Sequence, residues 1–517
     1  MTETRGFDSP KLDWILAVLF FFAALAIRLP NFMEVPRYAD EGFEVLWGLD
    51  FALGKHLPLT GYTTHYGPFF AYLMAFLFLV FGIHLELPRL TTTIFGALAV
   101  AMTYGLGRVM WNRMAGIIGA GFALTNPALI IYGSHHDWSA SLTPFFATAT
   151  LTTMYAGIVH RKNGLLILSG LLAALTMQSH PASIVILFAS ALWFFHLPDW
   201  KVRIKERTGL VAVLLFLVGY APMIIAWARI LNPFGTALDN VSSSLSLART
   251  PQEYLTRLIE FLKVTGYTFG GGYGQATIFL RVQAVLVEIL LIASIVRTWR
   301  LRLELISLIL VVSIGLLTFF LGELSERYYL FLFPLAFVAI GVFVTKIARW
   351  AGNALVQSSG IRRMALSTLR FGLPVLVLAL VAIPVNTLAR YYAEAFTAGA
   401  TNQEYFRLLA VVRQNRACEE SLLVEDAPED FSTLTSTQSW YALHAIDYVL
   451  RLDQCAHRML PREELARALK PSDRVVISEP SFAELTDRTR FENIAKINPP
   501  LVVEQRVPIL FLQVTRW

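Results

Sequence analysis

Two neighbouring carboxylates, Asp40 and Glu41, follow shortly after the first long apolar run of the chain, which ends at Pro30. Carboxylates at a membrane–water boundary can bind a cation, attract a basic substrate or accept the proton of an attacking hydroxyl. We therefore take Asp40 as a candidate general base and Glu41 as a residue that orients or binds substrate. The other open interpretation is that both acids stabilise the N-terminus of a helix over 41–54.

A second polar group, His135-His136-Asp137, lies in a very short connection between two apolar runs. Asp137 could face Asp40 across a cavity, where it would bind a cation or order the acceptor, with His136 in the same cavity. For a divalent metal, Asp137 and Glu41 are the candidate ligands. The alternative is that Asp137 caps the helix that follows it.

Two further segments of the first part of the chain carry polar side chains beside apolar runs. His65 and Tyr66 precede Gly67-Pro68 and could line the cavity, or form only the turn before a helix. Arg89 begins the next run and could bind a substrate phosphate, although an arginine at a helix end often extends to lipid headgroups instead.

The later part of the chain supplies three more candidates for substrate binding. His180 precedes Pro181 in a turn, where a solvated histidine is the alternative. Arg327 and Tyr328 begin an apolar run, and an arginine there could bind a phosphate or anchor to headgroups. Tyr267 opens the segment 267–274 (YTFGGGYG), which we expect to be a loop that covers the cavity or one without substrate contact.

The elements that position these residues are membrane helices. The chain has 517 residues, of which 56% are hydrophobic and 15% charged, and runs of about 20 apolar residues recur along it. Its net charge of +6 comes from basic residues in short loops, which is the positive-inside pattern of membrane proteins and no sign of nucleic-acid binding. Twelve apolar runs fall near 12–30, 66–83, 88–108, 114–133, 139–159, 164–180, 181–197, 208–230, 277–297, 301–321, 326–346 and 371–388.

The run 66–83 decides the topology. If it lies in the interface and the N-terminus is cytoplasmic, the basic loops near 108–113, 161–162, 201–207, 297–302 and 346–370 all lie inside. We therefore predict eleven spans plus one interfacial helix. All the candidate residues, the loop 231–276 and the chain after about 390 then lie outside.

The composition changes beyond residue 389, where charged residues become frequent. We predict a transmembrane catalytic domain over 1–389 and an extracytoplasmic α/β domain over 390–517. In the second domain we expect helices over 404–415 and 440–450, strands over 421–425 and 474–478, and a terminal strand pair over 501–504 and 509–514. Both cysteines, Cys418 and Cys455, lie there and form a disulfide or stay two buried thiols.

The sequence resembles the GT-C membrane glycosyltransferases of the protein O-mannosyltransferase and aminoarabinose-transferase-like group (family 39-like). The resemblance rests on the order of a first span, the pair Asp40-Glu41, the segment His65–Pro68, Arg89 on the next span, Asp137 after the third span and Arg327-Tyr328 on a later one. It covers about residues 12–345 and weakens after 200. The sequence has Gly67-Pro68 where that family usually has Pro-Pro, and it lacks a lysine that some relatives carry beside that segment.

This resemblance implies an inverting transfer of a monosaccharide from a polyprenyl-phosphate donor on the outer face of the membrane, with Asp40 as base and Arg89 or Arg327 near the phosphate. The acceptor would be a protein, a lipid or a glycan. Metal dependence varies within the family, so no cofactor is implied beyond an optional divalent ion. The chemistry is consistent with the sequence, which has no phosphate-binding loop for a nucleotide.

Three other functions are open. A transporter or lipid flippase would use the acids as coupling sites, but it typically shows paired repeats and acids near the middle of its spans. A non-catalytic scaffold would function without Asp40. An enzyme of the same fold could instead transfer a whole oligosaccharide.

Overall fold

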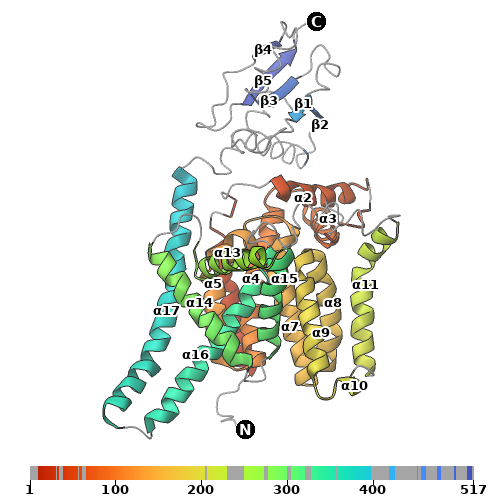
Figure 1. Cartoon of the computed structure of the whole chain (residues 1–517). Helices are drawn as coiled ribbons and strands as arrows, with labels where there is room; N and C mark the ends of the chain where they lie inside the picture. The colour runs from red at the N-terminus through yellow and green to blue at the C-terminus, as the bar shows by residue number, and fades with distance from the viewer. Residues whose placement is uncertain are drawn as a thin grey trace. The chain divides into compact units, whose positions relative to one another are not determined.

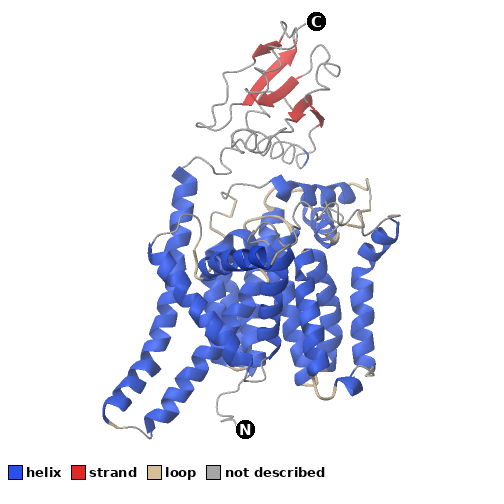
Figure 2. Cartoon of the chain, in the orientation of Figure 1, coloured by secondary structure: helices blue, strands red, loops and turns tan. Residues whose placement is uncertain are grey.

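The structure is a computed structural model of the whole chain. Its described residues are 10–30, 32–33, 39–55, 57–60, 66–203, 206–229, 250–272, 278–299, 304–320, 328–356, 359–397, 419–425, 451, 456–461, 474–478, 494–496 and 509–514. Within 39–397 almost every described element is helical (Figure 2). The helices are α1 (Pro10–Arg28), α2 (Ala39–Ala52), α3 (Phe69–Phe81), α4 (Leu87–Met110), α5 (Arg113–Thr125), α6 (Pro127–Ser134), η1 (Ser139–Leu142), α7 (Thr143–Val159), α8 (Asn163–Ser179), η2 (Pro181–Ser183), α9 (Ile184–His196), α10 (Trp200–Arg203), α11 (Arg207–Arg229), α13 (Pro251–Phe269), α14 (Ile278–Trp299), α15 (Glu304–Phe320), α16 (Leu332–Val356) and α17 (Gly360–Thr397).

The chain is a multi-pass membrane protein. Six of the described helices are long and apolar enough to cross a membrane, or seven if the bent pair α5 and α6 is one span. Four shorter apolar helices accompany them, including α3, which has 13 residues. At 1.5 Å per residue, α3 is about 20 Å long and falls short of a hydrocarbon layer of about 30 Å. The count of eleven spans and the interfacial position of α3 stay predictions.

The chain divides into two compact units, which we describe separately. The first unit comprises Met1–Phe32, Pro58–Phe70 and Arg89–Tyr391, and the second comprises Met33–Leu57, Ala71–Pro88 and Tyr392–Trp517. The predicted domain boundary at 389/390 stays a prediction.

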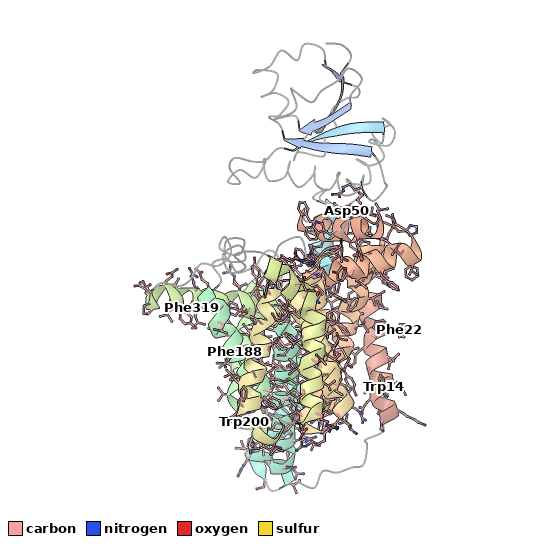
Figure 3. The ribbon with its side chains drawn as sticks, turned by 90° about the vertical axis from the view of Figure 1, so that its right-hand side faces the viewer. Trp14, Phe22, Asp50, Phe188, Trp200 and Phe319 are labelled. Carbon is pink, nitrogen blue, oxygen red and sulfur yellow. The ribbon has the colours of Figure 1, made fainter. Side chains whose placement is uncertain are left out.

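In the first unit, α8 packs between α7 and α11, while α16 packs on α5 (Figure 1). Small residues allow close packing: a Cβ added to Gly107 would lie 2.7 Å from the Cα of Gly116, as is typical of helix pairs in membranes. Trp14 and Phe22 project outward from α1 and are 74% and 61% exposed (Figure 3). Such exposed apolar side chains fit a helix that faces lipid.

In the first unit one expected span is bent, and one expected loop is wrong because it contains a helix. The run 114–133 is broken into α5 and α6, which meet at an angle of 67°, because Pro127 lacks an amide hydrogen and Asn126 before it is extended. The expected long loop over 231–276 contains the 19-residue helix α13, whose first turn is capped by Thr250. In Figure 1 this helix runs across the bundle rather than along it.

In the second unit, α2 and α3 make a close approach at Gly48, where an added Cβ would lie 2.6 Å from that of Met74. Asp50 of α2 pairs with Lys55 and with Arg451, each at 3.0 Å. The helix that begins with the candidate acids is therefore joined to the C-terminal part of the chain within this unit.

The second unit also contains a five-stranded sheet with the order β2-β1-β3-β5-β4. Its strands are β1 (Glu419–Glu425), β2 (Ala456–Pro461), β3 (Arg474–Ser478), β4 (Ile494–Lys496) and β5 (Ile509–Val514). β1 pairs in parallel with β2 and β3, whereas β5 is antiparallel to β3 and β4. Strands occur where we expected them at 421–425, 474–478 and 509–514, while the expected helices, the strand 501–504 and both cysteines lie outside the described residues.

Candidate functional site

The break between α5 and α6 is built by two adjacent residues. Asn126 accepts the amide hydrogen of Leu129 through its side-chain oxygen at 3.1 Å, so it caps α6, and Pro127 occupies the first helical position. The side-chain nitrogen of Asn126 donates to the carbonyl oxygen of Thr268 at 2.8 Å. The last turn of α13 is thereby attached to the break.

The short helix α6 ends at the predicted triplet of polar residues. His135, His136 and Asp137 are each no more than 1% exposed. Nε2 of His135 donates to the carbonyl oxygen of Arg28 at 2.8 Å, and Nδ1 of His136 donates to that of Ile131 at 2.9 Å. Since a carbonyl only accepts, these bonds fix the hydrogen on Nε2 of His135 and on Nδ1 of His136.

His135 is held uncharged. Burial lowers the pKa of its imidazole to about 3, while the bond to the Arg28 carbonyl acts in the opposite direction. Two arginines near it, Arg89 and Arg28, further disfavour its protonation.

His136 is clamped in an aromatic stack. Its ring centroid lies 4.9 Å from that of Trp138 and 5.3 Å from that of Tyr132, with interplanar angles of 19° and 16°. Trp138 Nε1 and the Ser141 hydroxyl both donate to the carbonyl oxygen of Tyr132. The ring is therefore preorganised, and its tautomer makes Nε2 the acceptor nitrogen.

Asp137 lies between α6 and η1 and is fully buried. The residue at the N-terminus of η1 is Trp138, and α7 begins only at Thr143. Asp137 therefore does not occupy the N-cap position of either following helix, which weakens the capping interpretation.

Arg89, in the first turn of α4, is also fully buried, and its Nη1 donates to the carbonyl oxygen of Phe32 at 2.9 Å. An arginine that extends to headgroups would keep its guanidinium in the polar layer, so that alternative is wrong. The hydroxyls of Thr92 and Thr93 donate to the carbonyl oxygen of Ser134 at 2.9 and 3.1 Å. The start of α4 and the end of α6 are thus joined, which brings the Arg89 turn beside the His135–Asp137 segment.

Three other candidates form a second cluster in the same unit. His180 is 1% exposed and makes edge contacts with Tyr66 and Tyr328, both at 5.5 Å between ring centroids. The solvated-turn interpretation of His180 is therefore wrong. Its Nδ1 accepts the amide hydrogen of Ala182 at 3.1 Å, so Nε2 carries the hydrogen.

Gln178 fixes the segment that carries Tyr66. Its side-chain oxygen accepts the amide hydrogen of Phe69 at 3.0 Å, and its carbonyl oxygen accepts that of Gly67 at 3.1 Å. Its side-chain nitrogen donates to the carbonyl oxygen of Gly219 on α11. An added Cβ at Gly67 would lie 2.4 Å from the Gln178 side chain, so only glycine allows this approach.

The glycine-rich segment after Tyr267 differs from the expected loop. Tyr267–Phe269 belong to α13, and Gly270–Gly272 are buried. Gly271 has φ of +84°, and an added Cβ would lie 2.3 Å from Pro384 on α17. At Gly272 it would lie 2.3 Å from the Tyr267 ring. These glycines allow close packing at the end of the helix, and the Tyr267 ring packs within the chain.

Four candidates remain untested. Asp40 and Glu41 belong to the first turn of α2, but their side chains, like His65 and Arg327, lie outside the described residues. α2 belongs to the second unit, and the pairing of Asp40 with Asp137 stays a prediction. No group of three His, Cys, Asp or Glu side chains that could hold a metal occurs in the described part of the chain, and the side chain of the proposed ligand Glu41 is not among those described.

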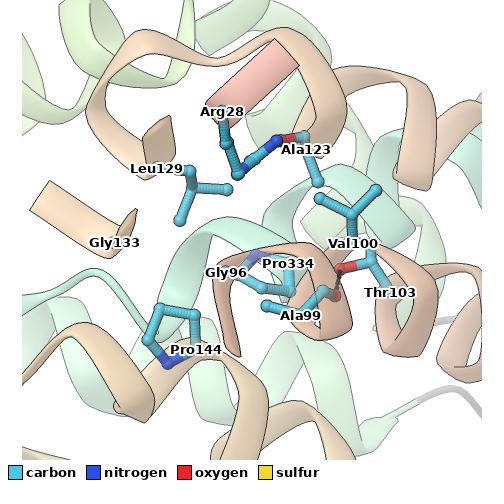
Figure 4. A pocket seen from close by; sticks show the side chains of 10 residues that line it. All are labelled: Arg28, Gly96, Ala99, Val100, Thr103, Ala123, Leu129, Gly133, Pro144 and Pro334. Carbon is cyan, nitrogen blue, oxygen red and sulfur yellow. Dashed lines mark hydrogen bonds between the residues drawn. The ribbon is translucent and has the colours of Figure 1, made fainter. Parts of the chain in front are cut away.

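The sequence interpretation missed Arg28, a fully buried cation near the end of the first apolar run. A small cavity of about 10 Å³, room for roughly one water molecule, lies beside it (Figure 4). Ligand pockets measure roughly 300–1,000 Å³, and most residues around this one are apolar. We therefore assign it to packing around Arg28 and not to substrate.

The family model for dolichyl-phosphate-mannose-protein mannosyltransferase matches residues 65–227. No curated protein matches the chain by sequence.

Solved structures match along nearly the whole chain. The structure of ArnT from Cupriavidus metallidurans bound to undecaprenyl phosphate is 13% identical, with a TM-score of 0.57, and the match covers 97% of each chain. The Archaeoglobus fulgidus oligosaccharyltransferase complex with Zn and sulfate is 15% identical, with a TM-score of 0.54, and the match covers 86% of this chain and 62% of that one. The predicted GT-C glycosyltransferase fold is confirmed.

Proposed function

We propose that this chain, which has the GT-C fold, is an integral-membrane glycosyltransferase that moves a monosaccharide from a polyprenyl phosphate to an acceptor on the outer face of the membrane. The observation that carries the proposal is the buried group Arg89, His136 and Asp137, held at the start of α4 and the end of α6. Ionisable side chains inside a bundle of membrane helices are rare and commonly mark a functional site.

The likeness to ArnT supports the donor class, because the matched structure of that enzyme holds undecaprenyl phosphate. A sugar on a lipid phosphate already carries its leaving group, so the reaction needs no nucleotide. In our proposal Arg89, with Arg327, binds the phosphate, and the planar guanidinium donates paired hydrogen bonds to its oxygens.

The reaction follows from these groups. Asp40 accepts the proton of the acceptor hydroxyl, whose oxygen attacks the anomeric carbon from the side opposite the phosphate. The bond from that carbon to the phosphate oxygen breaks, the phosphate leaves with the electron pair, and the configuration inverts. Arginine stabilises the charge that develops on the leaving phosphate. Glu41 and Asp137 orient the acceptor, and Asp137 with Glu41 would hold a divalent ion if one is used.

The aromatic cluster of Tyr66, His180 and Tyr328 has the chemistry of a sugar site. Its rings offer apolar faces, and Nε2 of His180 and the two phenol groups offer hydrogen-bond donors. We assign it to the transferred sugar or to the acceptor, which leaves phosphate binding to the arginines.

The test compares Asp40→Asn with Asp50→Asn, a change of the same kind on the same helix. Membranes that contain each variant receive radiolabelled polyprenyl-phosphate monosaccharides and a cell-envelope extract. Loss of a general base lowers a rate by roughly 10²–10⁴-fold, so we expect Asp40→Asn to lose at least 100-fold and Asp50→Asn to stay near wild type. Transfer that survives Asp40→Asn would exclude Asp40 as base.

Transfer of a whole oligosaccharide is the second candidate, because the Archaeoglobus fulgidus enzyme of that type shares the fold. This chain spans 62% of the length of that protein. Donors that carry one sugar and donors that carry several, offered in parallel, separate the two functions.

A further inference from the structure

We propose that Arg28 is a positioning residue, which holds the two halves of the broken α5–α6 span and so sets the geometry of the His135–Asp137 segment. The catalytic part of this inference rests on the proposed function. Arg28 is fully buried and lies at the C-terminal end of α1.

The break leaves backbone carbonyls without their usual helical partners, and Arg28 supplies donors to them. In a continuous helix the carbonyl of Ala123 would accept the amide hydrogen of residue 127, but Pro127 has none. Nη2 of Arg28 donates to this carbonyl at 3.2 Å, and Nη1 donates to the next one, Leu124, at 3.3 Å. Figure 4 shows the side chain directed at Ala123.

The same arginine also binds the far end of α6. Its Nε donates to the hydroxyl of Ser134 at 3.1 Å, and its own carbonyl accepts from Nε2 of His135 at 2.8 Å. One residue of α1 therefore contacts the last turn of α5, the last residue of α6 and the first residue of the polar segment.

The electrostatics favour a cation at this point. The C-terminus of a helix carries a partial negative charge, and both Ala123–Leu124 and Ser134 lie at C-terminal ends. The planar guanidinium, with donors in three directions, can serve both ends at once. A lysine ammonium would keep the charge but has no planar fork to match these acceptors.

A displacement of Ser134 would also move the His135–Asp137 segment, which follows it directly in the chain. The carbonyl of Ser134 also accepts the hydroxyls of Thr92 and Thr93, in the helix turn that carries Arg89. Loss of the Arg28 contacts should therefore loosen α6 and the segment 135–138, while the rest of α4 keeps its packing.

The experiment uses Arg28→Lys and Ser134→Ala in the full-length protein, with Arg161→Lys as the matched control. Arg161 also binds two partners, but its side chain is 56% exposed in a loop. Hydrogen exchange of peptides covering 129–142 is compared with exchange of peptides covering α16, and kcat and the donor KM are measured for each variant.

We expect Arg28→Lys to exchange at least tenfold faster in 129–142 and unchanged in α16, with kcat at least tenfold lower and the donor KM within threefold. Ser134→Ala should show the same pattern with smaller amplitude, and it decides the question if Arg28→Lys does not fold. Unchanged exchange in 129–142, or a uniform increase over the whole protein, would overturn the positioning role. If wild type transfers no sugar from any donor, the proposed function fails, whereas the exchange result still decides what Arg28 holds.

Discussion

His135 shows how burial decides the chemistry of a single residue. Its imidazole donates to a backbone carbonyl, and burial together with two arginines lowers its pKa to about 3. The ring beside it, His136, has the opposite tautomer, so neighbouring histidines present different atoms to their surroundings. His136 fits a substrate-binding role, because its Nε2 can accept a hydrogen bond from a substrate hydroxyl. His135 has a structural role, because its Nε2 donates to the backbone carbonyl of Arg28.

The pKa of His135 predicts a pH dependence of stability. Between pH 6.5 and 3 the unfolded chain binds a proton that the folded protein does not, so stability falls as the pH falls through this window. At pH 5 the free energy of unfolding is lower by about 2 kcal/mol, because pH 5 lies roughly 1.5 units below the ordinary histidine pKa and each unit corresponds to about 1.36 kcal/mol. His135→Gln should therefore lose less thermal stability than wild type between pH 7.5 and pH 5.

The measurement is the unfolding midpoint of the purified protein in detergent at both pH values. His160→Gln is the control, because its Nε2 also bonds a backbone carbonyl but at an exposed position. A variant with the same acid sensitivity as wild type would show that His135 takes up its proton in the folded state.

The break between α5 and α6 shows what the sequence predicts about an element and what it does not. An apolar run over 114–133 was evident, and Pro127 was visible within it. The angle was not, because it depends on partners distant in sequence: Arg28 for the carbonyls of α5 and Thr268 for Asn126. The helix α13 was not predicted either. Polar and apolar residues are interspersed along it, so the segment contains no long apolar run of the kind used to place the other helices.

The contact between α4 and α6 leads to a prediction at this scale. A methyl group at Gly96 would lie 2.1 Å from the Ser134 hydroxyl and 2.8 Å from the Gly133 carbonyl, whereas one at Gly105 on the same helix meets nothing within 4 Å. Gly96→Ala should therefore cost about 1–3 kcal/mol by overpacking and also lower transfer activity. Gly105→Ala should be neutral or stabilising by up to about 1 kcal/mol, since alanine favours helix.

Thermal midpoints and initial transfer rates of the two variants, each compared with wild type, provide the measurement. Equal behaviour of Gly96→Ala and Gly105→Ala would mean that α4 and α6 separate without consequence for the site.

At the scale of the whole molecule, the fold class followed from the order of a few polar residues among apolar runs, and the match to ArnT over 97% of both chains bears it out. The structure brings some of the candidate residues together: Arg89, His136 and Asp137 lie at joined helix ends, and Tyr66, His180 and Tyr328 cluster. Their roles in a site stay predictions. Sequence alone could not distinguish Arg28 from a basic residue at the membrane surface, because its buried contacts are with α5 and α6, about a hundred residues further along the chain.

The topology yields the last prediction. The basic loops were assigned to the cytoplasm, which places the connection at Lys162 inside and Gln252, an exposed residue of α13, outside. With both native cysteines replaced by serine, Lys162→Cys should react with an impermeant maleimide in right-side-out vesicles only after permeabilisation, whereas Gln252→Cys should react at once. A third chain, which keeps only Cys455, should behave like Gln252→Cys, because we propose that the C-terminal domain lies outside. Reaction of Lys162→Cys in sealed vesicles would reverse the orientation, and it would place the proposed donor and acceptor chemistry on the cytoplasmic face.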